Sequence, residues 1–179
     1  MPIHIITDHE QLRHLRSAVS IASTNCVTAI AKLLTSETPI NALARMKFHE
    51  LGFRPTMDRR LNLIEQINQT FTYLVSYAAA AQLLKRHPDS APICLNLGTS
   101  SGSDLESLST SIAAEVFAEV SRSNNRKLVK DVAKVSASGL AYKYVFFYCP
   151  AEECRSFRLK QFPDVEIVPL SEAEVWGDL

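Results

Sequence analysis

Two glutamates, Glu115 and Glu119, lie inside an otherwise apolar segment that runs from Ile112 to Val120. An ionised carboxylate that is buried without a partner is strongly unfavourable, so any fold must give these side chains solvent, a cation or a hydrogen-bond donor. If the segment is a strand, alternation places both glutamates on one side with Ala113 and Phe117, and a wholly apolar set on the other. We therefore predict a strand with one apolar face and one face that carries carboxylates.

A second pair of acids precedes this strand. Ile93 to Leu97 is a short apolar run between turn residues, which predicts another strand. A turn rich in glycine and serine, residues 98–103, follows it, and Asp104-Leu105-Glu106 opens the next extended piece. The region from 93 to 120 thus predicts strands that carry three acidic side chains close to one another in sequence.

Bulk composition limits the classes of protein to consider. The chain has 179 residues and is 46% hydrophobic, which suits a single domain over residues 1–179 that buries roughly two-thirds of its unfolded surface. The 19 basic and 19 acidic residues cancel, so the molecule as a whole does not attract nucleic acid or acidic membranes. Any affinity for phosphate must come from a local patch.

The sequence also indicates a soluble, cytoplasmic protein that does not enter a membrane. It contains no uninterrupted apolar segment long enough to span a bilayer, and charges interrupt its first residues where a signal peptide would be apolar. Four cysteines, Cys26, Cys94, Cys149 and Cys154, show no framework spacing, which is typical of free thiols in a reducing compartment.

The expected elements change in character along the chain. Residues 1–57 read as a helical N-terminal extension, and residues 58–179 as an α/β core in which helices flank a mixed β-sheet. Asp58 serves as the expected cap of a long helix that ends before Pro88. The remaining expected elements are strands at 93–97, 112–120, 142–149 and 165–169, and helices at 9–35, 40–51, 124–135, 152–160 and in the tail around Trp176.

The element order from Asp58 to Pro169 resembles the αβββαβ core of the PD-(D/E)xK, or restriction endonuclease-like, nuclease superfamily. The resemblance implies that an acid at the start of the second strand and another on the third hold Mg²⁺, which activates water and neutralises charge on the scissile phosphate. Asp104 and Glu115 match these two positions. They are eleven residues apart, which allows a hairpin to bring them together across adjacent strands.

The same resemblance supplies two further acidic candidates. Glu106 shares the strand side of Asp104 and is a candidate third metal ligand. Glu65 corresponds to an acid that some of these nucleases carry on the first helix.

The sequence departs from the family at the motif lysine, because Phe117 stands where Glu-x-Lys expects the lysine. Some family members supply this lysine from the following helix, and Lys127 is the nearest candidate. Helical geometry places Lys127, Lys130 and Lys134 opposite the apolar face of that helix. With Arg122 and Arg126 they form a candidate phosphate track for nucleic acid, DNA in the first place.

Three other interpretations stay open at this point. The glutamates can lie on the exposed face of an edge strand, beside an ordinary solvated helix face. A catalytically inactive protein with the nuclease fold can act through its partners, and its N-terminal helices can form a homodimer. The segment from Leu95 to Gly102 is similar to the glycine loop of S-adenosylmethionine-dependent methyltransferases, although too few residues follow it for the rest of such a sheet.

Overall fold

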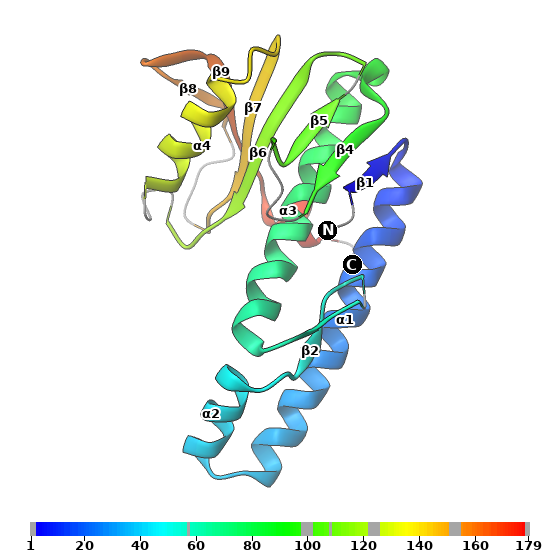
Figure 1. The fold of residues 1–179 in the computed structure, drawn as a ribbon, viewed down its shortest axis with the longest axis vertical. Helices are drawn as coiled ribbons and strands as arrows, with labels where there is room; N and C mark the ends of the chain where they lie inside the picture. The colour runs from blue at the N-terminus through cyan, green and yellow to red at the C-terminus, as the bar shows by residue number, and fades with distance from the viewer. Residues whose placement is uncertain are drawn as a thin grey trace. The chain divides into compact units, whose positions relative to one another are not determined.

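The computed structural model describes residues 3–56, 58–97, 102–107, 109–121, 126–150 and 155–177. The chain packs as two compact units, one formed by the chain up to Leu12 together with the chain from Leu74 onward, and the other by Arg13–Tyr73. The helices are α1 (His9–Ser36), α2 (Pro39–Phe48), α3 (Leu63–Arg86), a 3₁₀ turn at Pro88–Ser90, α4 (Lys127–Ser136) and α5 (Glu172–Trp176) (Figure 1).

A seven-stranded mixed sheet organises the first unit. The strands lie in the order β1 (Ile3–Ile6), β4 (Ile93–Asn96), β5 (Leu105–Ser107), β6 (Ile112–Ala118), β7 (Tyr142–Tyr148), β9 (Phe162–Pro169) and β8 (Phe157–Leu159). The pairs from β1 to β6 are antiparallel, β6 with β7 and β7 with β9 are parallel, and β9 with β8 is antiparallel. The strand that carries Glu115, β6, is therefore the middle strand and has a neighbour on each side.

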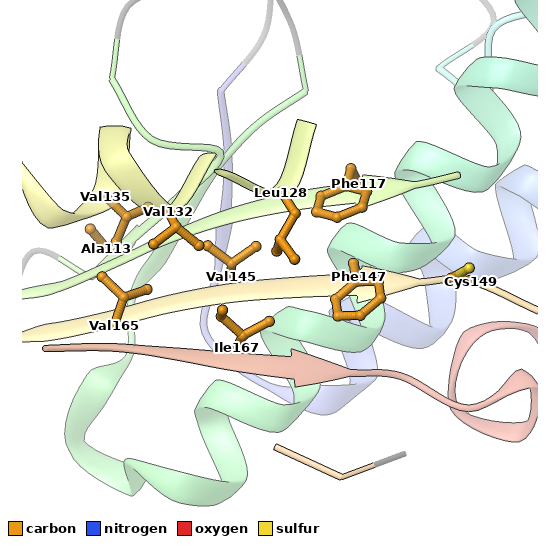
Figure 2. Close-up of a cluster of buried hydrophobic side chains, with 10 residues drawn as sticks. All are labelled: Ala113, Phe117, Leu128, Val132, Val135, Val145, Phe147, Cys149, Val165 and Ile167. Atoms are coloured by element: carbon orange, nitrogen blue, oxygen red, sulfur yellow. The ribbon is translucent and has the colours of Figure 1, made fainter. Parts of the chain in front are cut away.

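Helix α4 connects the two parallel strands β6 and β7 and covers one face of the sheet. Its apolar residues pack on side chains from β6, β7 and β9, and Phe117 stacks on Phe147 with ring centroids 5.2 Å apart. Figure 2 shows this cluster, in which side chains of α4 and of the strands lie close together. Its members are Ala113, Phe117, Leu128, Val132, Val135, Val145, Phe147, Cys149, Val165 and Ile167.

The C-terminal half of α3 and the short helix α5 contact residues of β7 and β9 on the side away from α4. The Tyr144 hydroxyl lies 2.8 Å from Nε2 of His87, and Arg86 forms an ion pair with Glu166 at 2.8 Å. The ring of Tyr148 packs edge to face against Trp176. With a helix contributing to each side, the central strands are buried on both faces, as near-continuous apolar parallel strands usually are.

The second unit contains most of α1, all of α2, the β2–β3 hairpin (Gly52–Phe53 and Arg60–Leu61) and the first part of α3. The start of α3 is fixed by a reciprocal pair of hydrogen bonds. The Glu65 amide donates to the Asn62 side chain, and the Asn62 amide donates to the Glu65 carboxylate. This pair is the capping-box arrangement that satisfies two amides at a helix end.

Among the described helices, α1 alone has the length and apolarity that a membrane span requires, judged on length and composition. Its most apolar 18-residue window has a mean hydropathy of 1.3, and 22% of that window is buried.

The structure confirms the mixed α/β class and the strands predicted around residues 93–97, 112–120 and 142–149. Two predictions about individual elements were wrong. Asp58 does not cap α3, because it precedes strand β3 and pairs instead with Arg54 and Thr56. The helix expected over 152–160 is replaced, in its described part, by strand β8, whose Phe157 and Leu159 pack on the α4 cluster.

Candidate active site

The register between β5 and β6 brings Asp104 and Glu115 together. Leu105 pairs with Ala114 in antiparallel register, so Asp104, just before Leu105, lies opposite Glu115, just after Ala114. The Asp104 amide donates to the Glu115 carboxylate at 3.3 Å, and the Val116 amide donates to Oδ2 of Asp104 at 2.9 Å. The carbonyl of Asp104 also accepts the Asn96 amide of β4. Backbone from two neighbouring strands thus fixes Asp104 beside Glu115.

Glu115 is buried beneath α4. Only 2% of its surface is exposed, and its side chain shares a strand face with Ala113 and Phe117, both in the apolar cluster. Its cationic partner is Lys134, whose Nζ lies 2.8 Å from the Glu115 carboxylate. The interpretation of Glu115 as an exposed residue on an edge strand is therefore wrong.

One stripe of α4 supplies the other charged groups. Lys127, Asp131 and Lys134 follow one another at helical spacing, alongside the apolar stripe that packs on the sheet. Asp131 is buried, and its Oδ1 accepts a hydrogen bond from Lys127 at 2.7 Å. Its Oδ2 is buried without a hydrogen-bond partner among the described residues. Three carboxylates and two ammonium groups thus belong to one electrostatic cluster.

The pKa values in this cluster reflect burial and crowding of like charges. Burial, and after it the charge of Asp104, raise the pKa of Glu115 to about 7, although the hydrogen bond from Lys134 opposes both effects. Burial also raises the pKa of Asp104 and the pKa of Asp131. Partial burial lowers the pKa of Lys134, but the hydrogen bond to Glu115 and the nearby carboxylates raise it more. Lys134 consequently stays charged at neutral pH.

The other predicted metal ligands do not join this pair. Glu106 lies on β5, where its carboxylate accepts the Ser103 amide at 2.9 Å. Glu65 belongs to the second unit and pairs with Arg59 at 2.6 Å. Within the described residues, no three His, Cys, Asp or Glu side chains gather into a group that could hold a metal ion. The carboxylates of Asp104 and Glu115 are the candidate ligand pair.

The basic residues predicted to bind phosphate do not share one environment. Lys130 is exposed, and Arg126 is exposed at the N-cap of α4 with a left-handed backbone, φ 54°. Arg122 lies outside the described residues. Lys127 contacts Asp131, whereas Lys134 contacts Glu115. The expectation that Lys127 and Lys134 both point away from the sheet was wrong, because both lie at the margin of the buried helix face.

Asp131 was not among the residues predicted for the site. The sequence contains a signal for it, because Lys127, Asp131 and Lys134 stand at i, i+4 and i+7 and so form one continuous stripe along a helix. That stripe adjoins the apolar positions Leu128, Val132 and Val135.

No protein-family model matches the chain, and neither a curated protein nor a solved structure matches it significantly.

Proposed function

We propose that this protein is a metal-dependent nuclease that hydrolyses nucleic-acid phosphodiesters, with Asp104 and Glu115 as the cation ligands and Lys134 as the catalytic lysine. The observation that carries the proposal is the convergence of these three residues. The Asp104 amide donates to the Glu115 carboxylate at 3.3 Å, the Asp104 charge acts on that carboxylate, and the Lys134 ammonium group lies 2.8 Å from it.

A pair of carboxylates suits Mg²⁺. This cation keeps several water ligands and usually takes one or two protein carboxylates together with substrate phosphate oxygens. Oδ2 of Asp104 accepts the Val116 amide, and no other described residue donates a hydrogen bond to its Oδ1. When bound there, the cation supplies an activated water and neutralises charge on the scissile phosphate.

Element order supports the same family. The chain runs α3, β4, β5, β6, α4 and β7, which is the αβββαβ order, with Asp104 immediately before the second strand and Glu115 on the third. The missing motif lysine also has a physical reason. Phe117 is 4% exposed and stacks on Phe147 in the apolar cluster, so a lysine at that position would place an ammonium group in the core. A lysine on α4 can reach Glu115 without that cost.

The remaining residues have roles that follow from their positions. The Lys134 ammonium group donates to Glu115. In the proposed reaction the same ammonium group holds the attacking water beside that carboxylate. Asp131 fixes Lys127 at the start of α4. Lys130 and Arg126 extend into solvent from the same helix and offer contacts to phosphates of a DNA strand. The described cysteines, Cys26, Cys94 and Cys149, are free, which agrees with a cytoplasmic location.

The test is cleavage of labelled DNA and RNA by the full chain with Mg²⁺ or Mn²⁺. Asp104→Asn and Glu115→Gln keep the size of each side chain, and we expect each to abolish cleavage while the chain remains folded. Lys160→Met, in the exposed turn between β8 and β9, is the control for charge removal away from the site. Full activity in either carboxylate variant would remove that residue from the mechanism.

A catalytically inactive protein of the same fold is the second candidate, because Lys134 already compensates Glu115 in the structure. Binding of DNA without cleavage, unchanged by Mg²⁺, would favour this candidate. The methyltransferase interpretation finds no support in the topology, since β4 is followed by the antiparallel strand β5 and not by a helix.

A further inference from the structure

The ammonium group of Lys134 engages both oxygens of the carboxylate that the proposed cation needs. Its Nζ lies 2.8 Å from Oε1 and 2.8 Å from Oε2 of Glu115. The Asp104 amide also donates to this carboxylate, at 3.3 Å. Only 3% of the Glu115 side chain is exposed, so a cation has no open side of it to approach. Cation binding at Glu115 therefore requires Lys134 to release at least one of the two oxygens.

Lys134 has the freedom to make this change. Its side chain is 49% exposed, and a lysine carries its three donors on a flexible four-carbon stem. Once a cation shares the site, repulsion between the two positive charges favours a new acceptor for the released donor. A carboxylate is a stronger acceptor for an ammonium group than a neutral group is.

Asp131 offers such an acceptor. It stands three residues before Lys134 on α4, where side chains at i and i+3 are neighbours. Its Oδ1 accepts a hydrogen bond from Lys127, whereas its Oδ2 is buried without a partner among the described residues. Only 4% of Asp131 is exposed, and an unpaired carboxylate oxygen at that depth is unfavourable. Burial raises the pKa of Asp131, and the charge of Lys134 acts against that rise, so the two groups already interact.

We propose that Asp131 is a positioning residue that holds Lys134 when a cation takes one oxygen of Glu115, an inference that rests on the proposed cation site. The ammonium group then donates to the other oxygen of Glu115 and to Oδ2 of Asp131. Its third donor stays available for the attacking water. Asp131 acts through Lys134 and is not itself a cation ligand.

The test is a double-mutant cycle on cation affinity, measured by calorimetric titration of the full chain with Mn²⁺ and without nucleic acid. We expect Asp131→Asn to weaken Mn²⁺ binding on the order of tenfold, as loss of one hydrogen bond between charged groups does. In a Lys134→Met background the same change should weaken binding less than about threefold, because only the screened attraction of the Asp131 charge is then lost. Asp89→Asn is the matched control, since Asp89 is exposed on the 3₁₀ turn, and it should bind as the wild-type chain does.

Equal losses in the two backgrounds would overturn the proposal, because Asp131 would then attract the cation directly. A wild-type chain that binds no Mn²⁺ would overturn it together with the proposed cation site. Asp104→Asn separates these failures, because loss of Mn²⁺ binding in this variant supports the cation site whatever the cycle shows. A chain that binds Mn²⁺ but does not cleave nucleic acid would refute the nuclease proposal alone. Asp131→Ala completes the same cycle if Asp131→Asn fails to fold.

Discussion

Glu115 makes the stability of this protein depend on pH in a direction that a surface glutamate does not. Its pKa is about 7 in the folded chain, against an ordinary value of 4.5. The folded state therefore binds the proton more tightly than the unfolded state. The stability that this proton contributes is fully present below pH 4.5 and is lost as the pH rises through about 7.

The magnitude follows from the size of the shift. One pKa unit corresponds to about 1.4 kcal/mol of differential interaction, so the loss between pH 5 and pH 8.5 is at most about 3 kcal/mol. Lys134 does not offset it in that range, because its own pKa is raised above 10.5 and it stays protonated. Glu115→Gln removes the titrating group and keeps the shape of the side chain. We expect this variant to lose less stability than the wild-type chain over the same range.

The assay is urea unfolding followed by circular dichroism at pH 5 and at pH 8.5, with EDTA present to keep cations from the site. The quantity of interest is the difference between the two proteins in their change of unfolding free energy with pH. Glu50→Gln provides the matched control, because Glu50 is exposed on the second unit, and it should follow the wild-type chain. Parallel pH dependences of wild-type chain and Glu115→Gln would show that Glu115 is not buried as described.

Two other substitutions test the packing that positions the site and the second unit. Phe117→Lys places a lysine where the resembled nuclease motif carries one. Phe117 is buried against Phe147, so we expect thermal unfolding to show a loss of about 3 kcal/mol or more. Near wild-type stability would contradict the burial argument for the phenylalanine at this position. Gly52→Ala drives a Cβ into Oε1 of the buried Gln66 and brings it within 3.3 Å of the buried Cys26 sulfur, so we expect a loss of roughly 1–3 kcal/mol. Gln66→Ala in the same chain should recover part of that loss, and strictly additive effects would contradict the clash.

The strands around the site could be predicted from the sequence, because their local residue pattern agrees with their burial in the fold. Alternation in β6 and the aromatic, β-branched composition of β7 identified both strands. The spacing of Asp104 and Glu115 was also readable, since a hairpin of that length has few registers in which both acids share a strand side.

The sequence did not show which lysine contacts Glu115. On α4, Lys127 and Lys134 lie near the same helical stripe, and their distances to the sheet depend on how Leu128, Val132 and Val135 seat on the strands. That seating is a tertiary property. The start of α3 was missed for a related reason, because Asp58 and Asn62 are both good N-caps and only the β2–β3 pairing before Asn62 decides between them.

The central claim is that Lys134, together with Asp104 and Glu115, forms a hydrolytic site. The most direct measurement is the single-turnover rate of DNA cleavage with Mg²⁺ for Lys134→Met and Lys127→Met, with the melting temperature of each recorded. We expect Lys134→Met to lose on the order of 100-fold or more in rate, as removal of a positioned catalytic group does, and Lys127→Met to lose much less. A folded Lys134→Met that cleaves at the wild-type rate would contradict the claim.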